Sequence, residues 1–296
     1  MRRTKENGMA LVLVLVLVAL LVATVGEFVY TVYTGSAQLK AWQQVEAMGV
    51  LATSALESGK DIFAQKVSAF SYTYPSELSI PIVLEEETAT VTIQDLQSKI
   101  NLNALVFQNG TDNERLMKVS RRVLEALDIP QETLDIIADW IDPDQESRLA
   151  GSEEGAKNGP LAVFDELYYI KGIKKEYIDR MQDFFTVYPD RSSLSEKINI
   201  NTAKKEILMA MAEAVTEQMA TEAIRERDED PFERCSDIKR ISGFETVYPE
   251  FSALCSVKSS FYRIEAVAQK GELTSMTEAI VRIDGGSAKI LLFREF

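Results

Sequence analysis

A stretch of eighteen residues without a charge, close to the N-terminus, constrains this chain more than any other feature. It runs from Met9 to Gly26, consists almost wholly of Leu, Val and Ala, and is followed by Glu27. A helix rises 1.5 Å per residue, so this stretch would reach about 27 Å and cross the hydrocarbon layer of a membrane. Three basic residues precede it. Because positive charge stays on the cytoplasmic side, we expect everything after Glu27 to face outward.

The segment before the apolar stretch decides how the N-terminus is processed. A secretory signal peptide would have a shorter apolar core and a small-x-small cleavage site after it, and residues 23–26 make a poor site of that kind. A short basic leader that ends in Gly8, directly before Met9 and the apolar helix, is instead the arrangement cut by prepilin peptidases. It resembles the N-termini of type IV pilins and type II secretion pseudopilins. Cleavage between Gly8 and Met9 would leave the helix on the mature protein.

Charge and composition argue against enzymes and nucleic-acid binders. The net charge is −14, and removing residues 1–8, which carry three positive and one negative charge, would lower it to −16. Such a charge repels nucleic acid and attracts divalent cations. The chain has no histidine, which removes the commonest general base and the commonest transition-metal ligand. We therefore expect no catalytic residues.

Hydrophobic periodicity outlines the architecture. Apolar residues recur at three- and four-residue steps after the membrane stretch, and no proline occurs before Pro75, which predicts one helix from 9 to 66. Short alternating segments then predict an antiparallel sheet made from both ends of the chain. Its expected strands are residues 82–84, 88–93, 261–268, 276–283 and 288–293.

An internal repeat fills the chain between these strands. Residues 99–104 (KINLNA) echo residues 197–203 (KININTA), and residues 165–173 echo residues 236–244. Asn101 lies 71 positions before Gly172, and Asn199 lies 44 positions before Gly243, so the first copy carries 27 extra residues. We expect the asparagines to cap the helices that follow them and the glycines to close turns.

These patterns predict an α+β fold, in which a long N-terminal helix packs on an antiparallel sheet that carries a large, duplicated helical insert. The expected parts are a leader (1–8), a helix (9–66, with 9–26 in the membrane), a body (67–99 and 258–296) and the insert (100–257). The motifs of the helical insert are similar to those of SAM-like and helix-hairpin-helix modules.

The motifs in order carry a family resemblance. They are DLQSKINLN at residues 95–103, DWIDPD at 139–144, NGPL at 158–161 and DEL at 165–167. Together with the leader they resemble the minor pseudopilin K (GspK) family of type II secretion systems. The resemblance implies a bacterial inner-membrane protein with a periplasmic body, at the tip of the pseudopilus and beside the I- and J-type minor pseudopilins and the pseudopilus shaft.

Leu13 is consistent with that place. It is the fifth residue after the expected cleavage, where most pilins and pseudopilins have a glutamate that pairs with the N-terminal amine of a neighbouring subunit. A subunit at the tip has no such neighbour above it, and the K family lacks the glutamate. The resemblance therefore makes Leu13 a marker of the tip.

An acidic loop is the candidate metal site. Asp142, Asp144, Glu153 and Glu154 supply oxygen ligands of the kind that Ca²⁺ prefers, without the spacing of an EF-hand. From the residues alone a solvated acidic loop is the more usual explanation, because clusters of charged residues commonly lie in solvent. The resemblance implies calcium, because this region looks like the calcium-binding part of K-family members, although the loop is shorter after Glu154 than in the family.

The pairing of the cysteines and two competing functions stay open from sequence. Cys235 and Cys255 could form a disulfide in an oxidising periplasm or remain two buried thiols. The repeat also resembles modules that bind DNA through backbone amides, which would make the chain a membrane-tethered DNA-uptake protein. Residues 171–175 are its one basic hairpin, and the net charge argues against that function. A minor pilin of a type IV pilus is the third candidate.

Overall fold

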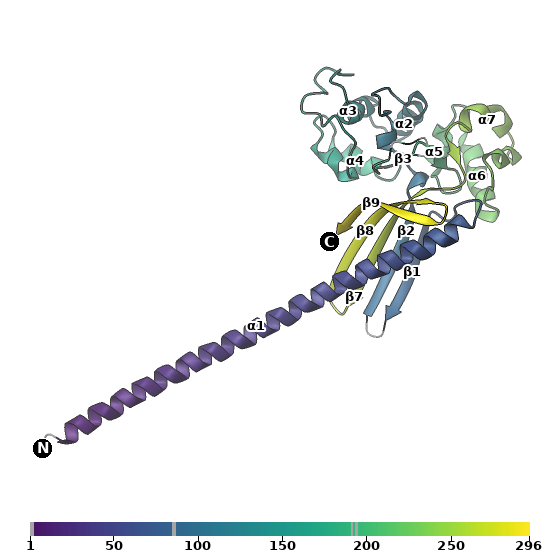
Figure 1. The fold of residues 1–296 in the computed structure, drawn as a ribbon. Coiled ribbons are helices and arrows are strands. Elements are labelled where there is room, and N and C mark those ends of the chain that lie inside the picture. The colour runs from purple at the N-terminus through teal and green to yellow at the C-terminus, as the bar shows by residue number, and fades with distance from the viewer. Residues whose placement is uncertain (1–2, 85–86, 191, 193–194) are drawn as a thin grey trace.

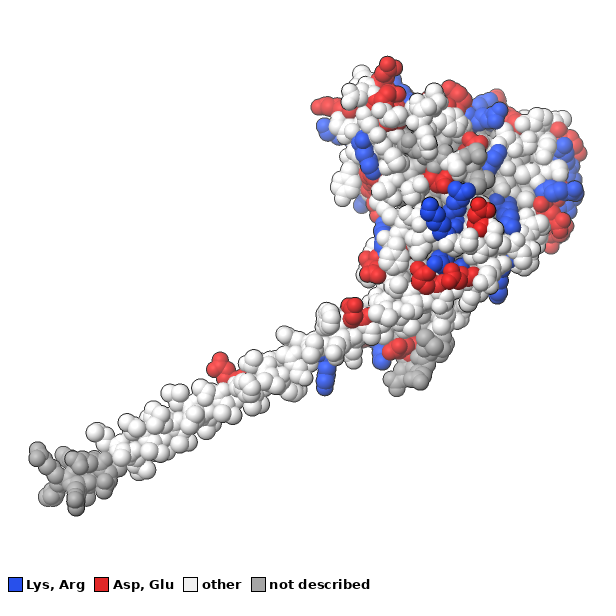
Figure 2. Space-filling view, viewed as in Figure 1, with Lys and Arg blue, Asp and Glu red and all other residues white. Residues whose placement is uncertain are grey.

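One continuous helix dominates the computed structural model, which describes residues 3–84, 87–190, 192 and 195–296. Helix α1 (Arg3–Ser68) is 66 residues long, and its N-terminal part extends away from the rest of the molecule (Figure 1). The most apolar stretch of this helix is not buried by any other described part of the chain. From Met9 onward the helix is long and apolar enough to cross a membrane. Figure 2 shows that charged side chains gather on the globular part, while few lie on the part of the rod that follows the grey end.

The C-terminal part of α1 packs on one face of an antiparallel sheet. The strand order is β1-β2-β7-β8-β9, so the first two strands pair with strands from the far end of the sequence. The strands are β1 (Glu77–Leu84), β2 (Glu87–Asp95), β7 (Phe261–Lys270), β8 (Leu273–Asp284) and β9 (Ser287–Glu295). This arrangement of helices around an antiparallel sheet confirms the predicted α+β class.

Small side chains allow the helix to approach the sheet closely. Ala52, Ala55 and Ala64 of α1 are buried in a core shared with alternate residues of β2, β7 and β8. A Cβ atom at Gly59 would lie 2.8 Å from Cγ1 of Val91, so this position has no room for a larger residue. β1 is longer than the predicted strand because Pro81, which lacks an N–H, is tolerated at the edge of a sheet.

The helical insert follows β2 and consists of two modules of the same plan. Each opens with a two-residue strand that pairs in parallel with a two-residue strand at its end, β3 with β4 and β5 with β6. The elements of the first module are β3 (Ile100–Asn101), η2 (Leu102–Ala104), α2 (Glu114–Ala126), α3 (Glu132–Ile141), η3 (Phe164–Tyr169), α4 (Lys175–Met181) and β4 (Phe185–Thr186), preceded by η1 (Leu96–Ser98). Those of the second are β5 (Ile198–Asn199), α5 (Lys205–Ala210), α6 (Glu217–Glu229), η4 (Cys235–Arg240), α7 (Phe244–Phe251) and β6 (Cys255–Ser256).

The second asparagine of each Asn-x-Asn motif holds a distant loop, which the sequence did not predict. Asn103 donates to Leu161 O (2.9 Å) and accepts from Leu161 N (2.8 Å). Asn201 does the same with Phe232, at 2.8 and 2.9 Å. The expected capping role applies to the first asparagine of the first motif, because the Asn101 side chain caps the 3₁₀ helix η2. The second asparagine instead closes its module.

Two further features complete the modules. Gly172 and Gly243 lie between a 3₁₀ helix and an α-helix with φ of 92° and 96°, a region that strains residues with a side chain. In the second module a disulfide joins Cys235, at the start of η4, to Cys255 in β6, across 20 residues. The two cysteines are therefore bonded in this structure, and not free thiols.

A buried hydrogen-bond network joins the second module to the sheet. Asp95, at the end of β2, is 2% exposed and accepts from Gln97 N (2.8 Å), Asn199 Nδ2 (3.0 Å) and Thr202 Oγ1 (2.6 Å). Asn199 also donates to the carbonyl of Thr73, in the connection between α1 and β1. These donors are neutral, and burial raises the pKa of Asp95 despite them.

Asp95 makes stability fall as pH rises. Because its pKa is raised above the ordinary 3.8, the folded protein keeps this proton at pH values where the unfolded chain has lost it. The free energy of unfolding should therefore decrease from about pH 3.8 up to the raised pKa of Asp95. Urea unfolding in detergent, measured at several pH values, should show this decrease in wild type. The decrease should be absent from Asp95→Asn, whose side chain does not titrate. The exposed Glu272→Gln is the control, and identical pH profiles for wild type and D95N would refute the assignment.

Candidate functional site

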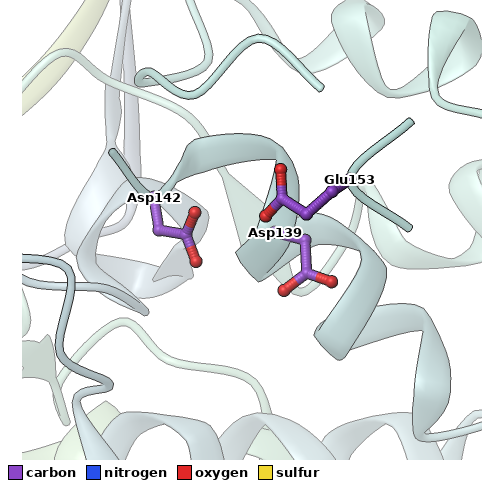
Figure 3. Close-up of side chains that lie close together, drawn as sticks. All are labelled: Asp139, Asp142 and Glu153. Carbon is purple, nitrogen blue, oxygen red and sulfur yellow. The ribbon is translucent and has the colours of Figure 1, made fainter. Parts of the chain in front are cut away.

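Three carboxylates converge at the C-terminal end of α3. Asp139 lies in the last turn of that helix and Asp142 directly follows it, so the i, i+3 spacing places both on one side. Glu153 comes from the loop that returns toward the helix. One oxygen of each lies within 4.8 Å of the others, and Figure 3 shows the carboxyl groups of Asp142 and Glu153 facing one another.

Arg148 binds one side of this cluster. Its guanidinium lies 2.5 Å from Asp139 Oδ1 and 2.6 Å from Asp112 Oδ1, and it also contacts Asp142 Oδ2. The backbone N–H of Arg148 donates to Asp139 Oδ2, which Ser152 also contacts. Both oxygens of Asp139 are therefore bonded within the protein.

The other side of the cluster has carboxylate oxygens with no hydrogen-bond donor among the described residues. Asp142 Oδ1 and both carboxylate oxygens of Glu153 are buried and lack a partner in this part of the chain. Burial, followed by the charges of Asp142, Asp139 and Asp144, raises the pKa of Glu153. Burial also raises the pKa of Asp142, against the effect of Arg148. Oxygen atoms that are buried, close together and unpaired suit a hard divalent cation.

The structure brings together two of the four predicted metal ligands. Asp142 and Glu153 belong to the cluster, whereas Asp144 and Glu154 are exposed and lie outside it. The side chain of Asp144 accepts from Glu146 N (2.8 Å) and so shapes the loop. Asp139 was missed as a candidate ligand, although it belongs to the same DWIDPD motif as Asp142 and lies three residues before it.

Motif residues outside the cluster hold the ends of the loop. Glu166 Oε1 accepts from Trp140 Nε1 (3.0 Å), and Glu166 also accepts from Lys157 Nζ and from Ala162 N. Asn158 donates to Asp144 O at 2.6 Å. Although burial alone would raise the pKa of Glu166, the bonds from Ala162 N, Lys157 and Trp140 lower it. The DWIDPD, NGPL and DEL motifs thus form one structural unit.

A second candidate surface lies on α1 between the membrane stretch and the sheet. Phe28, Val32, Leu39 and Trp42 are large apolar residues with 68%, 53%, 55% and 63% of their surface exposed. With Gly35 they follow alternating steps of four and three residues, the spacing of a helix–helix seam. Leu13, within the apolar stretch, is 61% exposed, and Gly8 and Met9 lie inside the continuous helix.

Comparisons with known proteins identify the modules. Models of the type II secretion system (T2SS) protein K family match residues 98–190 and 198–258, which together make up more than half of the sequence. This chain belongs to the T2SS protein K family. The family predicted from the ordered motifs is confirmed, and the two matched ranges correspond to the two helical modules.

A solved structure shares the fold of this K-family chain. The crystal structure of the GspK-GspI-GspJ complex from the enterotoxigenic Escherichia coli type 2 secretion system contains a chain with a TM-score of 0.72 and 17% sequence identity. The match covers 87% of this chain and 99% of that chain. A direct sequence comparison with curated proteins found no match. The fold is therefore retained although few residues are identical.

Glu166 should stabilise the loop above its pKa and lose that effect in acid. Because the pKa is lowered below the ordinary 4.5, this stabilisation is present above about pH 4.5 and disappears as pH falls through the lowered value. We expect Glu166→Gln to cost roughly 1–3 kcal/mol at pH 7, since it loses bonds made to a charged acceptor. Urea unfolding at pH 7 and pH 3 measures the difference. The neighbouring exposed Asp165→Asn is the control, and an equal cost at both pH values would contradict the interpretation.

Proposed function

We propose that this K-family protein is a non-enzymatic minor pseudopilin that caps or initiates the type II secretion pseudopilus and so supports protein export across the outer membrane. The observation that carries the proposal is the apolar seam of α1, defined here as Phe28, Val32, Gly35, Leu39 and Trp42. Leu39 and Trp42 lie 12 and 15 residues beyond Glu27, which is about 18 Å or more along the helix, so lipid does not account for their exposure. A partner helix with its own apolar seam would cover them.

The partners follow from the family and the shared fold. The chain of known structure that shares this fold belongs to a GspK-GspI-GspJ complex. We propose that I- and J-type minor pseudopilins occupy the corresponding place beside this chain, above the pseudopilus shaft. Helix packing of this kind needs no catalytic group, in keeping with a chain that lacks histidine.

Two features support a position at the tip: the size of the helical modules, and the lack of a carboxylate at residue 13. The two helical modules lie at the end of the molecule opposite the free end of α1 (Figure 1), where a following subunit would have to pass them. Leu13 leaves the N-terminal segment without a buried carboxylate that would need the amine of a subunit above it. The two features together favour the top of the fibre.

We further propose that a prepilin peptidase cuts between Gly8 and Met9, and that α1 holds the protein in the inner membrane with its body in the periplasm. The basic residues before the apolar stretch favour this orientation. A disulfide between Cys235 and Cys255 suits an oxidising compartment. The negative net charge argues against nucleic acid as a partner.

Calcium is the proposed cofactor of the acidic cluster. Asp142 and Glu153 offer buried, unpaired oxygens beside Asp139, which fits a cation that prefers oxygen ligands. A bound ion would fix the loop after α3 to the helix by charge compensation. In this proposal calcium has a structural role and takes no part in a reaction.

The seam predicts which variants lose assembly. Trp42→Glu places a charge within it and should reduce recovery of the I- and J-type partners at least tenfold, the size expected for an interface hot spot. The measurement is affinity purification of the full-length chain from detergent-solubilised membranes of cells that make all three proteins. Gln44→Glu, exposed on another side of the same helix, is the control. Undiminished recovery with W42E would reject the seam as the interface.

Calcium should stabilise the protein through Asp142 and Glu153. A ligand at about one hundred times its dissociation constant adds about 2.7 kcal/mol, which corresponds to a rise of several degrees in the unfolding temperature. Thermal unfolding of the full-length chain in detergent, with EDTA or with Ca²⁺, measures this rise. Asp142→Asn and Glu153→Gln should abolish it, whereas Glu154→Gln, exposed and adjacent, should retain it. A wild-type protein that does not respond to Ca²⁺ would exclude the site.

A further inference from the structure

The positive charge of Arg148 lies among several carboxylates of the acidic cluster, as the charge of a bound metal ion would. Its guanidinium contacts carboxylates from three places in the chain: Asp112 before α2, Asp139 in α3, and Asp142 after α3. The side chain of Arg148 is 21% exposed, while those of Asp139 and Asp142 are 0% exposed. An arginine so enclosed by carboxylates neutralises charge that would otherwise be buried without compensation.

We propose that Arg148 is a built-in cation of this cluster, which limits the cluster to one divalent cation and weakens the binding of that ion. The inference rests on the proposed calcium site and concerns how many ions bind and how tightly. Arg148 would thus set the number of calcium ions that the cluster holds.

The oxygens divide between the two cations. Arg148 and Ser152 occupy both oxygens of Asp139, and Arg148 takes Oδ2 of Asp142. Asp142 Oδ1 and both oxygens of Glu153 receive no donor from the described residues. Asp142 is fully buried, so its unpaired oxygen is an observation independent of the acidity of the cluster, and it points to a missing positive partner. Asp142 would thus bridge the guanidinium and the divalent ion.

The charges lead to the same conclusion. Asp112, Asp139, Asp142 and Glu153 contribute four negative charges, and Arg148 contributes one positive charge. Lys157, the other cation of this loop, is bonded to Glu166 outside the cluster. One divalent ion therefore leaves a single negative charge in the presence of Arg148. Without Arg148, two such ions would be needed to neutralise the same four carboxylates.

The test counts calcium ions in the full-length protein in detergent. Isothermal titration with Ca²⁺ should give one equivalent for wild type, and two equivalents for Arg148→Gln with the first dissociation constant at least tenfold lower. Arg121→Gln is the matched control, because Arg121 of α2 pairs with the single carboxylate of Asp135 in α3 (2.8 Å), outside the cluster. It should bind one equivalent with unchanged affinity.

Folding provides a second measurement. Arg148→Gln should be less stable than wild type in EDTA and should regain stability in Ca²⁺, because a metal ion can replace the lost charge. If the variant is obtained only in Ca²⁺, elemental analysis of the dialysed protein should find two calcium ions per chain. A variant that stays unfolded in saturating Ca²⁺, or that binds one equivalent with wild-type affinity, would overturn the role of Arg148.

The two proposals fail differently. If neither wild type nor Arg148→Gln binds Ca²⁺, the calcium site itself is wrong, and the role of Arg148 falls with it. If wild type binds one equivalent and Arg148→Gln behaves identically, the calcium site stands and the role of Arg148 is refuted. The place of the protein in the pseudopilus is tested separately, by recovery of its partners.

Discussion

The packing of α1 on the five-stranded sheet is the contact on which the whole molecule is built. The same helix is apolar enough to cross a membrane at its N-terminal end and forms one side of the sheet's core at its C-terminal end. Alanines and Gly59 along that side bring the helix close to β2, which larger residues would prevent. Because α1 is continuous, the position of the sheet also determines where the helical modules lie relative to the apolar N-terminal stretch.

The helical modules are attached to that frame by both apolar and polar contacts. Tyr188, which follows β4 of the first module, is fully buried and stacks on Phe261 of β7 with 4.4 Å between the ring centroids. Asp95 ends β2 and receives hydrogen bonds from Asn199 and Thr202 of the second module, in a region from which water is excluded. Buried polar groups are costly unless every partner is in place, so such a junction favours one orientation strongly over others. The first module is joined to the second by one continuous apolar core and by Arg122, which donates to Ala210 O and pairs with Glu250.

Duplication explains how one module could acquire a loop without losing its fold. In both modules an asparagine closes a distant loop through two backbone hydrogen bonds, Asn103 with Leu161 and Asn201 with Phe232. The 27 extra residues of the first module lie between its asparagine and its glycine, so the clamp and the helical core are kept. Arg148 and Glu153 of the acidic cluster lie in the long loop after α3, whereas Asp139 lies in α3 itself and Asp142 directly follows that helix.

The long helix, the antiparallel strands, the repeat and the family all follow from the sequence alone, because each depends on neighbours a few residues apart or on motifs in order. Sequence reasoning did not reveal that Asp139 belongs to the cluster, that Arg148 binds three carboxylates, or that Asn103 and Asn201 are clamps. The clamp of Asn103 reaches across 58 positions, and the contact between Asp95 and Asn199 spans 104. Periodicity carries no information about such distances. These contacts are set when the chain folds, because charges and hydrogen-bond donors must then be matched as water is excluded.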